Sequence, residues 1–101
     1  MEARSLIVSF QDQGTADIFD GEDTKAARKT LQSSLHERAG RTLDQLSAAV
    51  SLKSLSLPGL RLEKLKGDRT GQHSIRINDQ YRVCFRWTEK GAQDVEIVDY
   101  H

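Results

Sequence analysis

The chain lacks the features that define several large classes of protein. Its 101 residues contain one cysteine, Cys84, and one proline, Pro58. A single cysteine can form neither an internal disulfide nor a cysteine-based zinc site, so no oxidising compartment is indicated. No apolar run approaches the roughly 18 residues of a membrane span, and the N-terminus lacks the pattern of a signal peptide. We therefore expect a cytoplasmic protein that does not bind membranes.

The chain also lacks net charge, but its charges are segregated along the sequence. There are 15 basic and 15 acidic residues in all. Residues 61–86 hold seven basic and three acidic residues, a net charge of +4, whereas residues 87–101 hold one basic and four acidic residues. A basic segment of this kind can bind nucleic acid even though the whole chain is neutral.

The segment 62–101 predicts a small antiparallel sheet, because three runs of alternating apolar residues are separated by turn-rich breaks. Successive strand side chains point to opposite faces of a sheet. One face is therefore expected to be apolar, with Ile75, Ile77, Tyr81, Val83, Phe85, Trp87, Val95 and Ile97. The other face is expected to carry Arg76, Arg82, Arg86, Cys84, Glu96 and Tyr100.

The N-terminal half supplies helices that could cover the apolar face. Residues 4–10 predict a first strand in the same sheet, and residues 15–19 predict one helical turn capped by Thr15. Residues 24–50 contain apolar side chains at helical spacing. They form either one broken helix or two; the pair Ser33-Ser34 with Glu37 resembles a capping box, which favours a short helix followed by a longer one from about Leu35 to Val50.

The fold that follows is α+β: an antiparallel sheet of about four to five strands, covered on one face by an N-terminal helical hairpin. The arginine face is expected to stay open. A length of 101 residues is suited to a single domain spanning 1–101.

Two stretches resemble a known family. The run from Gly67 to Phe85 and the C-terminal Val95–His101 are similar to the HigB family, also called plasmid maintenance system killer proteins, within the RelE/ParE toxin superfamily. Similar stretches at 24–28 and 43–46 extend the resemblance over nearly the whole chain.

The resemblance implies a RelE-like toxin of a type II toxin–antitoxin pair. Its activity would be that of a ribosome-dependent endoribonuclease, an mRNA interferase that cleaves translated mRNA in the ribosomal A site. Its partner would be a HigA-like helix-turn-helix antitoxin, and the free toxin is expected to be a monomer. Two alternatives remain open: a ParE-like toxin that binds DNA gyrase without being an enzyme, and a passive RNA-binding module.

The resemblance places the active site in the terminal motif Asp99, Tyr100 and His101. Metal-free RNA cleavage needs a proton acceptor, a proton donor and cations near the phosphate. Arg76 and Arg82 are expected on neighbouring strands of one face, where they suit capture of a phosphate. The alternatives are a frayed terminus and a solvated sheet face with ion pairs to Glu96.

Several further residues are candidates for contacts or catalysis. Lys64, Lys66 and Arg69 lie in a basic loop that could hold the RNA backbone or could be an ordinary charged hairpin, and Arg86 is a peripheral RNA-binding candidate. Some HigB relatives carry a catalytic histidine where Glu63 stands, so the general base is left open. His73 shares the parity of Ile75, which favours a structural role. No cluster of His, Cys and carboxylates predicts a metal or a cofactor.

Overall fold

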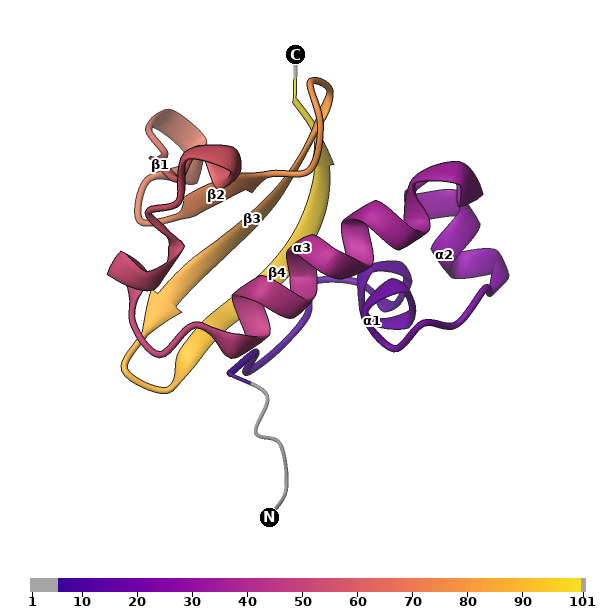
Figure 1. The fold of residues 1–101 in the computed structure, drawn as a ribbon, viewed down its shortest axis with the longest axis horizontal. Coiled ribbons are helices and arrows are strands. Elements are labelled where there is room, and N and C mark those ends of the chain that lie inside the picture. The colour runs from indigo at the N-terminus through magenta and orange to yellow at the C-terminus, as the bar shows by residue number, and fades with distance from the viewer. Residues whose placement is uncertain (1–5, 101) are drawn as a thin grey trace.

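Helices precede strands in residues 6–100, the part of the chain that the computed structural model describes (Figure 1). The helices are α1 (Gln13–Phe19), α2 (Lys25–Thr30) and α3 (His36–Ala48), with 3-10 turns at 33–35, 52–55, 58–60 and 67–69. The strands are β1 (Glu63–Lys64), β2 (His73–Arg76), β3 (Tyr81–Thr88) and β4 (Gly91–Asp99). They pair antiparallel in the order β1-β2-β3-β4. The predicted α+β fold is confirmed.

The helix boundaries follow capping chemistry, although not always at the predicted residue. Asp12, not Thr15, caps α1: its carboxylate accepts the backbone N–H of Thr15 at 2.7 Å. The Thr15 hydroxyl is buried and accepts the N–H of Ile97 at 3.3 Å, so this side chain joins α1 to β4 instead of capping. The interruption between two helices is confirmed, but the predicted Ser34 cap is not, because the 3-10 turn at 33–35 runs directly into α3.

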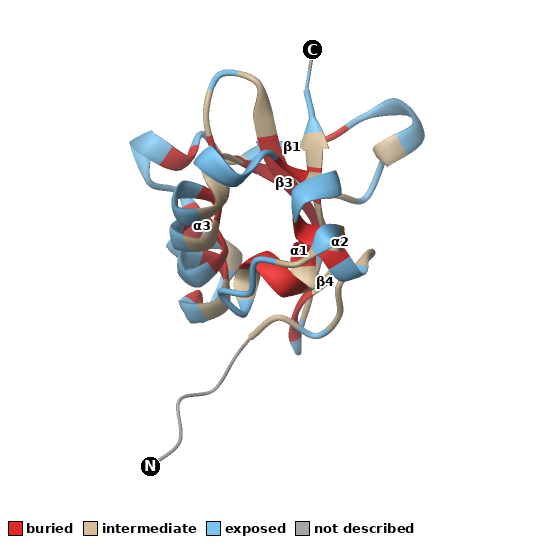
Figure 2. Ribbon diagram, turned by 90° about the vertical axis from the view of Figure 1, so that its right-hand side faces the viewer, coloured by how far each residue is buried: buried red, intermediate tan, exposed pale blue. Residues whose placement is uncertain are grey.

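The apolar face of the sheet forms the core together with α1 and α3. Ile75, Val83 and Ile97 are aligned across β2, β3 and β4, as their parity predicts. Phe85 and Val95 are fully buried in the same cluster, which also takes in Leu43 and Leu46 of α3. Figure 2 shows this arrangement as buried segments of strand and helix that face the interior, with exposed segments on the outside.

The predicted N-terminal strand follows β4 only at isolated points. Arg4 and Ser5 lie outside the described residues, while Ile7 and Phe10 form single parallel bridges to Ala92 and Val95. Between those two partners the register of β3 and β4 shifts, and Asp94 adopts a positive φ of 55°. This bulge interrupts the edge that a longer strand would need.

Candidate active site

The polar face of the sheet is less open than the sequence predicts. Ser74 and Cys84 are fully buried and Arg82 is only 7% exposed. The loop between β1 and β2 reaches over this face: Nη1 of Arg69 donates to Glu96 on β4 at 2.7 Å and to Gln72 at 3.0 Å. The hydrogen bond to Glu96 is also the main reason that the pKa of Arg69 is raised. The loop is therefore fixed over the sheet by an ion pair.

Arg82 is the centre of the site. Its Nε donates to the Ser74 hydroxyl at 2.7 Å and its Nη2 donates to the carbonyl of Arg61. On its exposed side, the guanidinium lies 5.4 Å from the centre of the Tyr100 ring, within the range of a cation–π contact. Nη1 lies 3.6 Å from a carboxylate oxygen of Glu63. The Tyr100 ring and the Glu63 carboxylate therefore both lie close to the Arg82 guanidinium.

The β2–β3 turn supplies the next part of the site. Arg76 is the cross-strand partner of Arg82, so the two side chains share a face, as predicted. Arg76 is the more accessible of the two and forms an ion pair with Asp79, whose side chain is 98% exposed. The backbone N–H of Tyr100 donates to the carbonyl of Gln80 at 2.6 Å, which attaches the end of β4 to the same turn.

Within the predicted terminal motif, Asp99 lies on a different face of the sheet from Tyr100. Asp99 pairs with Tyr81 and shares its face of the sheet, so its side chain lies on the side opposite Arg82. It accepts a hydrogen bond from Gln80 at 3.1 Å. His101 lies outside the described residues.

The remaining candidates lie around the rim of the site. Lys64 and Lys66 are exposed on β1 and at the start of the 67–69 turn. Arg86 is also exposed, with its Nε 3.9 Å from Asp94. His73 packs beside Phe85 on the inner face, and its Nδ1 is buried without a hydrogen-bond partner. Burial, with the nearby charge of Lys64, lowers the pKa of His73, which agrees with a structural role.

Sequence reasoning missed two arginines beside the β2–β3 turn, Arg38 on α3 and Arg61 before β1. Both charges act on Asp79: its pKa is lowered first by the hydrogen bond from Arg76 and by the charge of that residue, then by Arg38 and Arg61. A cavity of about 410 Å³ adjoins this group. Its lining comprises Arg38, Arg41, Thr42, Gln45, Leu57, Gly59, Leu60, Arg76 and Ile77. No local pattern in the sequence links α3 to this turn.

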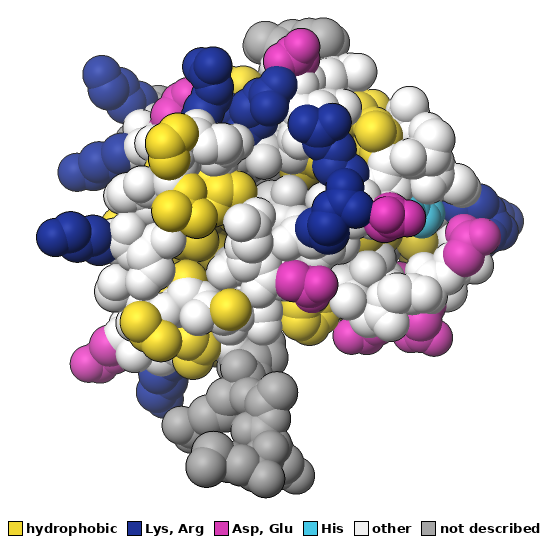
Figure 3. All heavy atoms as spheres, viewed as in Figure 1, with side chains coloured by type: hydrophobic (Ala, Val, Ile, Leu, Met, Phe, Trp, Pro, Cys, Tyr) yellow, Lys and Arg dark blue, Asp and Glu magenta, His cyan; other side chains and the backbone are white. Residues whose placement is uncertain are grey.

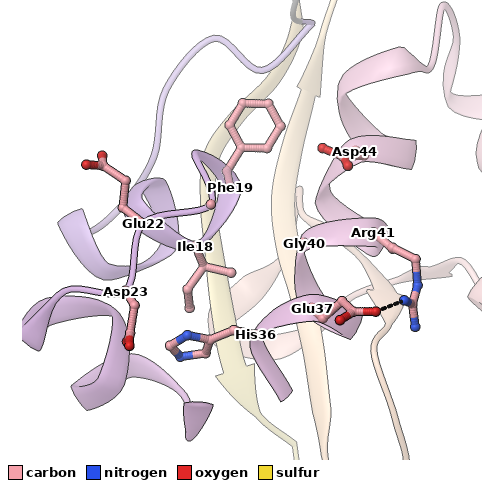
Figure 4. Close-up of a pocket in the computed structure, with 10 residues that line it drawn as sticks. Ile18, Phe19, Glu22, Asp23, His36, Glu37, Gly40, Arg41 and Asp44 are labelled. Carbon is pink, nitrogen blue, oxygen red and sulfur yellow. Dashed lines mark hydrogen bonds and ion pairs between the residues drawn. The ribbon is translucent and has the colours of Figure 1, made fainter. Parts of the chain in front are cut away.

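A second cavity, of about 360 Å³, lies between α1 and α3 and has the opposite charge. Figure 4 shows Glu22 and Asp23 on one side and Glu37, Arg41 and Asp44 on the other, with Ile18 and Phe19 between them. Within this lining Arg41 contributes a positive charge, which is paired with Glu37 at 2.9 Å.

In Figure 3, Lys and Arg side chains gather over the upper and left parts of one face, and Asp and Glu lie mainly lower and to the right.

Two kinds of feature are absent from the described part of the chain. Within residues 6–100, no three His, Cys, Asp or Glu side chains are grouped closely enough to bind a metal ion. None of the helices there combines the length and the apolar character that crossing a membrane requires.

Comparison with known proteins identifies the family. Residues 8–101 match the HigB-like toxins, described as the RelE-like toxin of type II toxin–antitoxin system HigB. "Toxin HigB-1" of Vibrio cholerae is 35% identical over 83% of this chain and 86% of its own length. "Endoribonuclease HigB" of Proteus vulgaris is 26% identical over 95% of this chain and 100% of its own length.

The fold has a counterpart among solved structures. A chain of the YoeB-YefM complex from Staphylococcus aureus superposes with a TM-score of 0.60 over 98% of this chain and 99% of its own, at 20% sequence identity. At 20% sequence identity, this likeness supports a shared fold but no inference about activity. The match to the family over residues 8–101 and the Vibrio cholerae relative together show that the chain belongs to the HigB-like toxins, the RelE-like toxins of type II toxin–antitoxin systems.

Proposed function

We propose that this toxin is a ribosome-dependent endoribonuclease that cleaves translated mRNA in the A site of cytoplasmic ribosomes. The observation that carries the proposal is the convergence of Tyr100 and Glu63 on the buried guanidinium of Arg82. An aromatic ring that can stack on an unpaired base thus lies beside a carboxylate that can accept a proton. The activity agrees with the name of the Proteus vulgaris relative.

Cleavage would proceed by attack of a ribose 2′ oxygen on the adjacent phosphorus. The bond from phosphorus to the 5′ oxygen breaks, which leaves a 2′,3′-cyclic phosphate and a free 5′ hydroxyl. Glu63 takes the proton from the 2′ hydroxyl, and His101, which follows Tyr100 directly, supplies the proton to the leaving 5′ oxygen. Tyr100 stacks on the base next to the scissile phosphate and orients it.

The two arginines have different parts in this scheme. Arg82 uses most of its donors on Ser74 and the carbonyl of Arg61, so it acts chiefly by holding Tyr100 and Glu63 in place. Arg76 is more accessible and supplies positive charge to the phosphate. Asp99 acts through Gln80, which it holds beside the terminal residues. Lys64, Lys66 and Arg86 contact the RNA backbone from the rim, and Arg69 keeps the covering loop in position.

The proposed assembly follows the family. The chain acts as one domain over residues 1–101, is a monomer when free, and is silenced by a HigA-like helix-turn-helix antitoxin. The structural neighbour from Staphylococcus aureus is itself part of a complex, YoeB-YefM, which supports a protein partner for this fold.

Primer extension on translated messages tests the activity. Purified toxin is added to a translating extract, and the 5′ ends of the message are mapped with and without ribosomes. We expect cuts that need ribosomes and that fall by about 100-fold or more for Glu63→Gln, which removes the base, and for Tyr100→Ala, which removes the stacking ring. Arg28→Gln, an exposed arginine paired with Asp23, should cleave normally.

One outcome would overturn the assignment of the base, and two would overturn the activity. Full cleavage by Glu63→Gln would show that another group takes the proton. The absence of cuts by the unsubstituted toxin together with arrested replication would indicate a gyrase-binding toxin. Binding to RNA without cuts would indicate a passive RNA-binding module.

A further inference from the structure

The basic cavity beside the β2–β3 turn has an anion of the chain itself at its edge, because Asp79 pairs with Arg76, one of the lining residues. Asp79 carries a carboxylate that is almost completely exposed, and its ion pair with Arg76 is its one direct contact among the described side chains. The charges of Arg38 and Arg61 act on the same carboxylate. One carboxylate at the surface is thus paired with Arg76 and attracted by two more guanidinium groups, and Arg38 lines the cavity together with Arg76.

Arg38 is held in a position from which it can bind a second anion. Its Nε donates to the carbonyl of Ile77 at 2.8 Å, at the end of β2. Its two terminal nitrogens make no hydrogen bond with residues 6–100, and Arg38 is one of the residues that line the cavity. A guanidinium fixed through Nε presents the paired donors that match a phosphate.

The cavity adjoins the proposed active site through Arg76, which is one of its lining residues. Arg76 is the cross-strand partner of Arg82, and the carbonyl of Arg61 accepts a hydrogen bond from Arg82. The carbonyl of Gln80, which follows Asp79, accepts the N–H of Tyr100. A strand with one nucleotide stacked on Tyr100 would therefore pass this cavity with a neighbouring phosphate.

We propose that Arg38 and Arg76, which line the cavity, form together with the neighbouring Arg61 a second phosphate-binding site for the RNA backbone, and that the Asp79 carboxylate pairs with Arg76 until RNA displaces it. The site rests on the proposed function and extends it, because it fixes the direction in which RNA leaves the active site. Asp79 then weakens RNA binding at rest by competing for the same arginines.

Binding to a short, fluorescein-labelled 2′-O-methyl RNA tests this proposal, since such an RNA lacks the 2′ hydroxyl that cleavage needs. Fluorescence anisotropy is measured over about 50–300 mM KCl. Arg61→Gln and Arg38→Gln should each weaken binding at low salt about 5-fold to 10-fold and lower the salt slope by about one. Asp79→Asn should strengthen binding by a comparable factor, which a merely structural effect would not do.

Arg28→Gln and Asp23→Asn are the matched controls, because they remove the same charges from an exposed pair elsewhere. Neither should change the anisotropy curve. Arg38 also donates to the Ile77 carbonyl, so its substitution could affect folding. The Arg61 side chain makes no hydrogen bond with the described residues, so Arg61→Gln tests the loss of charge without the loss of a structural contact. Urea unfolding of each variant completes the comparison.

The outcomes also distinguish this site from the proposed activity. If the unsubstituted toxin does not cleave but Arg61→Gln and Asp79→Asn shift RNA binding in opposite directions, the site stands and the enzyme does not. Co-sedimentation of each variant with ribosomes is measured as well. If only that binding changes, the phosphate bound at the site belongs to ribosomal RNA, and the site still stands. The site is overturned if the variants bind the labelled RNA and ribosomes as the unsubstituted toxin does. It is also overturned if only antitoxin binding changes, because the cavity would then bind an acidic protein segment.

Discussion

Both faces of the sheet contain fully buried side chains, but these are held in different ways. On the inner face, Phe85 and Val83 are covered by apolar side chains of the helices. On the outer face, Cys84 and Ser74 are also fully buried, and the loop over this face is joined to β4 by the ion pair of Arg69 with Glu96. Apolar burial is not screened by salt, whereas a partly exposed ion pair is weakened by it. The proposed chemistry lies on the face whose cover can loosen.

The largest expected contrast is between two neighbours in β3 that point to opposite faces. Phe85→Ala leaves a cavity in the apolar core and should lower the free energy of unfolding by about 3–5 kcal/mol. Cys84→Ala removes one small side chain and should cost about 1 kcal/mol or less. Urea denaturation measures both values. Equal losses would show that the outer face is packed as tightly as the inner one.

A second contrast lies within the outer face, between cross-strand partners. Arg82→Met leaves the Ser74 hydroxyl and the Arg61 carbonyl without their donor, and should lower the free energy of unfolding by about 2–3 kcal/mol. Arg76→Met affects an exposed pair and should cost less than about 0.5 kcal/mol. Denaturation at one salt concentration compares them. A larger loss for Arg76→Met would contradict the assignment of Arg82 as the structural member.

A smaller effect is expected for the covering loop. Arg69→Gln removes a half-exposed ion pair and should cost about 0.5–1 kcal/mol, with faster hydrogen exchange at the amides of residues 66–72. High salt should reproduce the faster exchange in the unsubstituted chain. Arg28→Gln serves as the control on an exposed pair. Slow exchange that resists both salt and substitution would show that the loop is fixed by other contacts.

The smallest effect concerns His73, whose pKa is lowered by burial and by Lys64. The unfolded chain then binds a proton at His73 more readily than the folded chain. Stability should therefore be complete above pH of about 6.5 and should decline as the pH falls below that value. Denaturation at several pH values measures the decline, and His73→Phe should reduce it while preserving the ring. An unchanged pH profile in that variant would assign the decline to other groups.

The sequence predicts the inner face well and the outer face only in part, for a physical reason. Alternation decides which side chains share a face, so Ile75, Val83 and Ile97 could be placed together without a structure. The contact between Glu63 and Arg82 depends on a two-residue strand that pairs with β2, which alternation cannot reveal. The position of Arg38 beside Asp79 depends on how α3 docks, and no sequence spacing encodes it.

Arg82 bonds the buried Ser74 and also contacts Tyr100, which has a consequence for how cells escape this toxin. Cells that survive expression of the toxin should carry two kinds of substitution in it. Substitutions at Tyr100 or Arg76 should yield intact, inert protein that the antitoxin still captures, whereas substitutions at Arg82 should yield protein that proteases remove. The guanidinium that contacts the Tyr100 ring is thus also the one whose loss should remove the protein from the cell.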